Sequence, residues 1–274
     1  MDPSFDRRRS RPHVRRRTGR TTTLHPVVTV GGLRVEVADR PGDDARRPLV
    51  LLHEGLGSVG LWRGFPEALH EATGRRVVAF SRFGHGRSDP PRVARTPAFF
   101  HEEALDVLPP LLEELDAPAP ILVGHSDGGS IALIHAASHA VSGLVLLAPH
   151  VFVEEITVAA IRETRRQFED GALRERMARH HDDPDAAFRG WCDVWLDPAF
   201  RDWSIEDDAA HVTAPALLIQ GADDPYGTLE QLDRIQARLQ GPVEKLVVPG
   251  GHSPHLDASE QVVGAIARFA APLA

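Results

Sequence analysis

The chain has 274 residues, of which 42% are hydrophobic, and its formal net charge is −8 at pH 7. This composition indicates one large globular domain, or one domain with an insertion, and excludes a broadly disordered chain. Cys192 is the only cysteine, so no disulfide forms within the chain. No apolar run approaches the roughly 20 residues that span a bilayer. We therefore expect a cytoplasmic protein with no membrane partner.

The first 20 residues differ from the rest in charge, because they hold eight arginines against Asp2 and Asp6. Blocks of like charge rarely fold, so we expect a disordered basic leader over residues 1–23. A nucleic-acid or anionic-membrane arm, or a start codon placed too early, are alternatives. The remaining chain is strongly acidic, which argues against nucleic acid as a partner. No pattern indicates the oligomeric state.

Short apolar runs alternate with helical patterns over residues 24–152. Strands are expected at Val27–Val30, Leu33–Val37, Pro48–Leu52, Arg76–Phe80, Ile121–Val123 and Gly143–Leu147. The first two form a hairpin through Gly31 and Gly32. Helical spacing is found after Trp62, over residues 99–115, and again up to about His139. Pro109 and Pro110 are expected to kink the second of these helices.

This alternation stops over residues 153–212, which contain several helical stretches and no convincing strand. It resumes with strands at Pro215–Gln220 and Val243–Val248 and helices at Gln231–Leu239 and Ser259–Phe269. Alternating strands and helices with short connections predict an α/β fold with a mostly parallel, doubly wound sheet. We expect a core of residues 24–152 and 213–274, with residues 153–212 inserted as a helical cap.

The most informative segment is Gly124-His125-Ser126-Asp127-Gly128, which lies between a buried apolar run and a helical pattern. G-x-S-x-G in this context puts a serine on a sharp strand-to-helix turn with its hydroxyl exposed. A serine hydroxyl needs a general base, and the base needs an orienting acid.

Two later loops offer candidates for that base and acid. Asp223 and Asp224 follow one strand, and His252 and His255 follow the next. Because sites of open α/β sheets form at the carboxyl ends of the strands, we expect these loops to meet Ser126.

With these motifs the chain resembles the α/β-hydrolase family over about residues 25–274. The order Ser126, Asp224, His252 is that of the family's catalytic triad, and Gly251-His252 matches its Gly-His pair. The loop His53-Glu54-Gly55-Leu56-Gly57 is similar to the family's oxyanion loop. Residues 81–88 are similar to its D-x-R-G-x-G-x-S loop, with Ser81 in place of Asp. The resemblance implies that Ser126 is the nucleophile, His252 the base and Asp224 the acid.

The resemblance also implies an oxyanion hole made by the backbone N–H groups of Asp127 and Gly55. The Asp127 side chain would oppose the developing negative charge if it pointed there. We expect its carboxylate to be directed to the N–H groups at the start of the helix instead. Glu54, where many members have glycine, is expected to pair with Arg82 or Arg63, or else to face the substrate pocket.

Several other residues have a structural and a functional interpretation. We interpret His125 as a structural histidine under the turn and His85 as a loop residue. Trp191 and Trp195, four residues apart on one helix face, pack in the core or line a substrate pocket. The adjacent pair His180-His181 with Asp182-Asp183 does not have the spacing of a metal site, so we expect neither a metal nor an organic cofactor.

The function expected from the sequence is that of a serine hydrolase acting on a small, fairly apolar carboxylic ester or lactone. A carbon–carbon bond hydrolase of aromatic ring-fission products is the nearest alternative, because such members carry a tryptophan nine residues after the loop histidine, as in His53 and Trp62. Thioesterases and cofactor-free haloperoxidases follow. A ligand-binding protein without catalysis is the alternative from another class.

Overall fold

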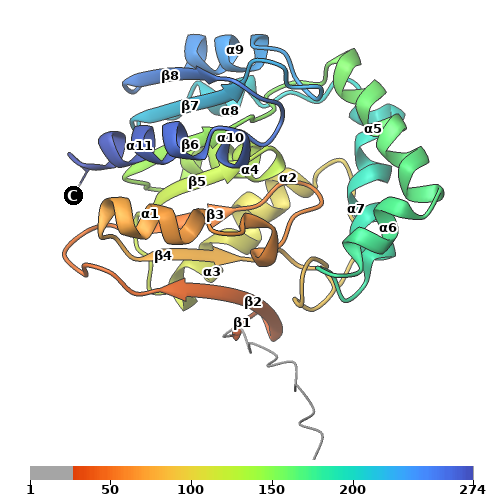
Figure 1. Ribbon diagram of the computed structural model, residues 1–274, viewed down its shortest axis with the longest axis horizontal. Helices are drawn as coiled ribbons and strands as arrows, with labels where there is room; N and C mark the ends of the chain where they lie inside the picture. The colour runs from red at the N-terminus through yellow and green to blue at the C-terminus, as the bar shows by residue number, and fades with distance from the viewer. Residues whose placement is uncertain (1–26, 274) are drawn as a thin grey trace, which may run out of the picture.

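The computed structural model describes residues 27–273, so the leader expected over residues 1–23 lies outside them. An eight-stranded sheet in the order β1-β2-β4-β3-β5-β6-β7-β8 forms the centre of the fold (Figure 1). The strands are β1 Val27–Val30, β2 Leu33–Arg40, β3 Leu49–Leu52, β4 Val77–Phe80, β5 Ile121–His125, β6 Gly143–Leu147, β7 Ala216–Gly221 and β8 Val243–Val248.

Only β2 runs in the opposite direction to the other strands of the sheet. β1 pairs antiparallel with β2, and β2 pairs antiparallel with β4, whereas all other neighbouring strands are parallel. Gly31 and Gly32 join β1 to β2 with φ of 56° and 80°, values that glycine adopts without the steric cost of a side chain. The mostly parallel sheet predicted from the alternation of elements is confirmed.

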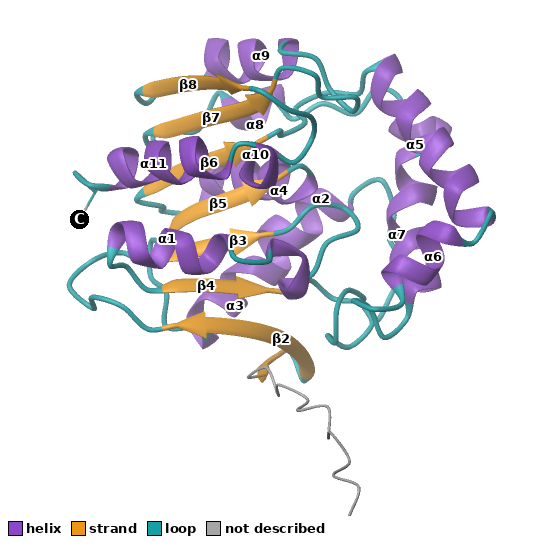
Figure 2. Ribbon diagram, in the orientation of Figure 1, coloured by secondary structure: helices purple, strands orange, loops and turns teal. Residues whose placement is uncertain are grey.

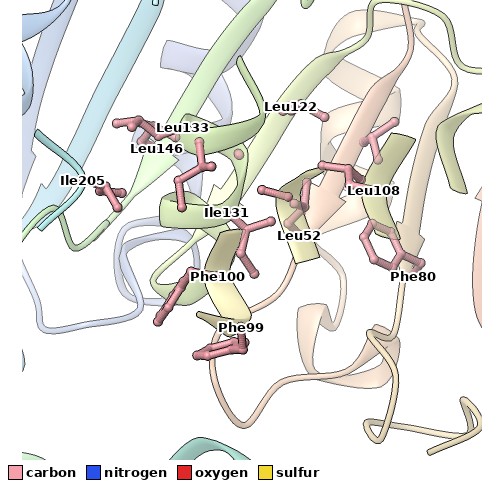
Figure 3. Packing of buried hydrophobic residues seen from close by; sticks show 14 of the residues in the cluster. Leu52, Phe80, Phe99, Phe100, Leu108, Leu122, Ile131, Leu133, Leu146 and Ile205 are labelled. Atoms are coloured by element: carbon pink, nitrogen blue, oxygen red, sulfur yellow. The ribbon is translucent and has the colours of Figure 1, made fainter. Parts of the chain in front are cut away.

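Helices cover both faces of this sheet (Figure 2). The helices of the described residues are α1 Phe65–Thr73, α2 Phe99–Glu102, α3 Leu108–Glu114, α4 Asp127–Ser138, α5 Glu155–Glu169, α6 Ala172–Met177, α7 Pro184–Trp195, α8 Glu206–Ala209, α9 Glu230–Arg238, α10 Pro254–Asp257 and α11 Ser259–Ala270. Successive strand residues point to opposite faces. Leu49 and Leu51 therefore join the core under α1 and α11, while Val50 and Leu52 join the core under α3 and α4. Figure 3 shows part of the second core.

The helix expected over residues 99–115 is interrupted before its two prolines. Between α2 and α3 the backbone forms a π-helical segment at Glu103–Val107. Pro109 and Pro110 have no N–H to donate, and their rings clash with carbonyls of the preceding turn in a regular helix. The wider π turn relieves that conflict, so the predicted kink takes the form of a π bulge.

The segment between β6 and β7 contains α5, α6, α7 and α8. The first three lie beyond the carboxyl ends of the parallel strands (Figure 1). In contrast, α8 packs against α4 and α9, and Ile205, Ala209 and Val212 belong to the core beneath the sheet. The helical cap expected over residues 153–212 stays a prediction, with α8 placed beside the helices α4 and α9.

Candidate active site

Ser126 stands between the last residue of β5 and the first residue of α4. Its backbone has φ 52° and ψ −120°, a strained conformation that is typical of functional sites. Other backbone approaches the neighbouring glycines closely. A Cβ on Gly124 would lie 2.3 Å from the Gly128 oxygen, and one on Gly128 would lie 2.1 Å from the Leu52 oxygen. This turn is possible only because these positions lack side chains.

A chain of hydrogen bonds joins Ser126 to His252 and Asp224. His252 Nε2 lies 2.9 Å from Ser126 Oγ, and His252 Nδ1 lies 2.9 Å from both carboxylate oxygens of Asp224. The Tyr226 N–H donates to Asp224 Oδ1 at 2.8 Å. Burial alone would raise the pKa of Asp224, but the hydrogen bond and charge of His252 outweigh it and hold that pKa below its usual value. Asp224 is therefore ionised at neutral pH and able to orient His252.

The rival candidates lie elsewhere. Asp223 is exposed, and its N–H donates to the Gly250 oxygen at 2.9 Å. His255 is buried against the rings of Trp62 and Phe65, with centroid distances of 5.0 and 5.2 Å. The structure thus brings Asp224 and His252, and not their neighbours, to Ser126.

The loop after β3, residues 53–58, is held by side chains from other segments. Three consecutive carbonyl oxygens accept hydrogen bonds from buried side chains. The donors are Arg82 Nη2 to Glu54 at 2.9 Å, His85 Nε2 to Gly55 at 2.9 Å and His181 Nε2 to Leu56 at 2.9 Å. His181 Nδ1 accepts from the Gly86 N–H at 3.0 Å, so its proton is on Nε2, as a donor requires. The backbone around Gly55 is therefore fixed beside Ser126.

A cavity of about 170 Å³ lies next to Ser126. The loop after β3, the start of α4, and helices α5 and α7 all contribute to its lining. Glu54, Trp191 and Trp195, the residues expected at a substrate pocket, all line it, together with Ile161 and His150. The two tryptophans are also buried in the core. The lining is mostly apolar, with a few polar atoms around Ser126.

Comparison with known proteins identifies the family. A family model described as "Alpha/beta hydrolase family" matches residues 49–265. The chain belongs to this family. Human serine hydrolase BPHL is 27% identical over 196 residues, which are 68% of this chain and 66% of the relative. The (Lyso)-N-acylphosphatidylethanolamine lipase of Bos taurus is 34% identical over 109 residues, or 39% of this chain and 31% of the lipase. The chain spans about a third of the length of the lipases that it matches.

Solved structures of other alpha/beta hydrolases share the fold. An esterase from Exiguobacterium antarcticum superposes with a TM-score of 0.70 at 21% identity, covering 90% of this chain and 99% of the esterase. The enol-lactonase of Burkholderia xenovorans gives a TM-score of 0.67 at 19% identity, covering 89% of this chain and 99% of the lactonase. The family resemblance and the fold expected from the sequence are thereby confirmed.

Within this alpha/beta hydrolase no arginine of residues 27–273 forms an ion pair with the Glu54 carboxylate, so the expected pairing is wrong. Arg82 donates to the Glu54 carbonyl oxygen, whereas the carboxylate Oε2 lies 3.6 Å from His125 Nδ1. Burial would raise the pKa of Glu54, but the electrostatic interaction with the His125 imidazole outweighs it and holds that pKa well below its usual value. His125 Nε2 donates to the His252 carbonyl oxygen at 2.6 Å. The structural histidine thus links the loop after β3 to the His252 loop.

The Asp127 carboxyl group also differs from expectation. Asp127 is the first residue of α4, but its Oδ1 accepts from Trp195 Nε1 at 3.2 Å, and its Oδ2 has no hydrogen-bond partner among the described residues. Burial raises the pKa of Asp127, and the nearby Arg82 and the Trp195 hydrogen bond only partly oppose that shift. The side chain lines the cavity and does not cap the helix.

Two further sequence observations find a structural explanation. Ser81, which stands where the family usually has aspartate, donates to Glu36 Oε2 at 2.7 Å and accepts from the Val59 N–H at 2.9 Å. A carboxylate from β2 thus occupies this loop. In the segment 180–183, His181 anchors the loop after β3, and Asp183 caps α7 by accepting from the Ala186 N–H. Over residues 27–273, no group of three or more potential ligands is arranged to hold a metal ion.

Several residues at the cavity are not predicted from the sequence. His150, Thr157 and Tyr226 line the cavity, and His85 was interpreted only as a loop residue although it holds Gly55. His150 comes just after β6, at the edge of the sheet where sites form, and this position was the signal that could have identified it.

None of the helices between residues 27 and 273 has the length and apolar character to cross a membrane.

Proposed function

We propose that this alpha/beta hydrolase is a serine hydrolase that cleaves a small, fairly apolar carboxylic ester or lactone through an acyl-enzyme. The observation that carries the proposal is the continuous hydrogen-bond chain from Ser126 Oγ through His252 to Asp224, each link 2.9 Å long. Ser126 and His252 come from loops far apart in sequence and both line one cavity, while Asp224 contacts His252 from a third loop. Such an arrangement is the recurrent solution for activating a serine hydroxyl.

The proposed reaction proceeds in two halves. Ser126 Oγ attacks the carbonyl carbon while its proton passes to His252 Nε2, and the tetrahedral intermediate collapses as that proton goes to the leaving alcohol oxygen. Water then gives its proton to His252 and attacks the acyl-enzyme, which releases the acid and restores Ser126. Asp224 stays ionised throughout and stabilises the imidazolium of His252.

The developing oxyanion would be bound by the N–H groups of Asp127 and Gly55. Asp127 is the first residue of α4, where backbone N–H groups lack acceptors within the helix. Gly55 is held by the His85 hydrogen bond to its carbonyl oxygen, so its backbone does not have to reorganise as charge develops. Each such donor typically lowers the barrier by about 3 kcal/mol.

The substrate class follows from the cavity. Its volume of about 170 Å³ and the apolar surfaces of Leu56, Ile161 and Trp191 favour a small, fairly apolar acyl group. The printed names of the similar proteins, an esterase and an enol-lactonase among them, are in keeping with esters and lactones. Trp62, on which the carbon–carbon hydrolase alternative rested, stacks on Phe65 and contacts His255, so it gives that alternative no substrate contact.

The proposal is tested by a hydrolysis screen over esters, lactones, thioesters and ring-fission dienoates, with Ser126→Ala as the control. We expect short-chain esters or lactones to be cleaved and Ser126→Ala to lose at least 10⁴-fold in kcat. Equal activity of Ser126→Ala and the unmodified protein would refute the assignment. A fluorophosphonate probe tests the ligand-binding alternative, because failure to label Ser126 would support a protein without catalysis.

A further inference from the structure

His150 is a buried residue of the cavity that the proposed reaction does not use. It follows β6 and is 3% exposed. Its backbone is fixed, since Ser130 Oγ donates to the His150 oxygen at 2.6 Å and the next N–H, that of Val151, donates to Gln231 Oε1 at 2.7 Å. The fold therefore holds the imidazole in place, although its ring makes no hydrogen bond to residues 27–273.

The His150 ring packs between aromatic neighbours and remains uncharged. Its centroid lies 5.1 Å from that of Trp195 in an edge-on arrangement and 5.7 Å from that of His252. Burial, reinforced by the nearby His252, lowers the pKa of His150 to about 3. A neutral imidazole has one N–H donor and one nitrogen acceptor. Nδ1 is buried with no partner within residues 27–273.

Asp127, which lines the same cavity, carries a second buried polar atom without a partner among the described residues. The residue is 1% exposed, its Oδ1 is occupied by Trp195 Nε1, and its Oδ2 has no partner in the described part of the chain. Trp195 therefore contacts both Asp127 and His150. Three elements, the start of α4, the loop after β6, and α7, bring these side chains together next to Ser126.

Unpartnered polar atoms are uncommon in protein interiors, because burying them without a hydrogen bond costs free energy. Here both line a cavity whose other walls are mostly apolar, so a bound ligand can supply what the fold does not. A hydroxyl group suits this pair, because it donates to a carboxyl oxygen and accepts from an imidazole N–H at the same time. An anionic group is disfavoured by Glu54 and Asp127, which lie on the same cavity.

We propose that His150 and Asp127 form a polar subsite that binds a hydroxyl group on the acyl part of the substrate. The preferred substrates are then esters or lactones of short hydroxy acids rather than of plain fatty acids. This inference rests on the proposed serine hydrolase function and adds the substrate class to it. An ammonium group, which would seek Asp127 and Glu54 as a cation, is the competing ligand that the test must separate from a hydroxyl.

The test compares kcat/KM for ethyl butyrate, ethyl 2- and 3-hydroxybutyrate, and ethyl 3-aminobutyrate by acid release at constant pH. We expect one hydroxybutyrate to be preferred over butyrate by about tenfold or more, which corresponds to one well-placed hydrogen bond. His150→Phe keeps an aromatic ring against Trp195 but cannot hydrogen-bond, so the preference should fall to near one. No preference in the unmodified protein, or a preference for the amino ester, would overturn the subsite.

Two further variants keep the test decisive. Asp127→Asn retains the acceptor for Trp195 and replaces the free oxygen with an amide NH₂, so it should also reduce the preference for hydroxy esters. This variant keeps the proposal testable if His150→Phe fails to fold. Thr164→Val is the control, because Thr164 lies on α5 outside the cavity lining and its hydroxyl already donates to the Ala160 oxygen at 2.9 Å; its preference ratio should match that of the unmodified protein. An unchanged ratio in both His150→Phe and Asp127→Asn would refute the subsite. Fluorophosphonate labelling of Ser126 is measured in parallel, because failure of labelling would count against the proposed function rather than against the subsite alone.

Discussion

The two walls of the cavity differ in how the buried polar groups of their lining residues are satisfied. On the wall made by the loop after β3 and by the His252 loop, the carbonyls of residues 54–56 are anchored by Arg82, His85 and His181, and His252 is hydrogen-bonded through both ring nitrogens. On the wall next to α7, Asp127 Oδ2 and His150 Nδ1 have no partner within residues 27–273. The first wall is organised before a ligand arrives, as electrostatic catalysis requires. The second wall leaves hydrogen bonds to be completed by the substrate.

The largest effect is expected from breaking the hydrogen-bond chain of the first wall. Asp224→Asn removes the carboxylate that orients His252 and stabilises its protonated form, so kcat should fall by about 10⁴-fold while KM changes little. Steady-state kinetics on the best ester measures this. Asp223→Asn is the matched control at an exposed site, and we expect it to keep its activity. Similar losses in the two variants would show that the acid has been assigned to the wrong position.

A smaller loss is expected when the loop after β3 is loosened. His85→Phe removes the donor to the Gly55 oxygen while leaving a ring in the buried site. Because the Gly55 N–H is proposed to stabilise only the oxyanion, kcat should fall about 10- to 100-fold with KM nearly constant. His85→Gln, whose amide can still donate, should recover part of kcat. A change confined to KM, or no recovery by glutamine, would argue against this positioning role.

The sequence predicted the first wall far better than the second. The first depends on local patterns, such as the glycines around Ser126, and on the rule that parallel strands end at one edge of a sheet, which placed Asp224 and His252 correctly relative to Ser126. The second depends on the packing of α7 against the sheet. The direction of the Asp127 side chain is set by Trp195, 68 residues away, and no periodicity encodes that contact. The Glu54 carboxylate likewise lies next to His125 rather than an arginine. Its neighbour could not be predicted from the sequence, because the folded arrangement decides which group is nearest.

Comparison of His255 with His150 separates the effect of burying a histidine from the effect of placing one on the cavity wall. Like His150, it is 3% exposed, and its Nδ1 has no hydrogen-bond partner among the described residues. Its pKa is also lowered to about 3, chiefly by burial. Unlike His150, it packs on Trp62 and Phe65 and does not line the cavity. In the unfolded chain this histidine takes up a proton near the ordinary pKa of about 6.5, whereas in the folded chain it does so only near pH 3. The folded state therefore loses stability as the pH falls below 6.5. For each such histidine, the free energy of unfolding falls by about 1.4 kcal/mol per pH unit in that range.

We therefore expect His255→Phe to reduce the loss of unfolding free energy between pH 6.5 and pH 5 by about 2 kcal/mol. Urea unfolding at the two pH values measures this, with His139→Phe at an exposed position as the control. An unchanged pH dependence in His255→Phe would mean that His255 is charged in the folded protein. His150→Phe should flatten the same profile to a similar extent, but only His150→Phe should alter the preference for hydroxy esters. If both variants flatten the pH dependence of stability, that effect comes from burial of the histidine. If only His150→Phe changes the preference for hydroxy esters, that effect comes from the position of His150 on the cavity wall.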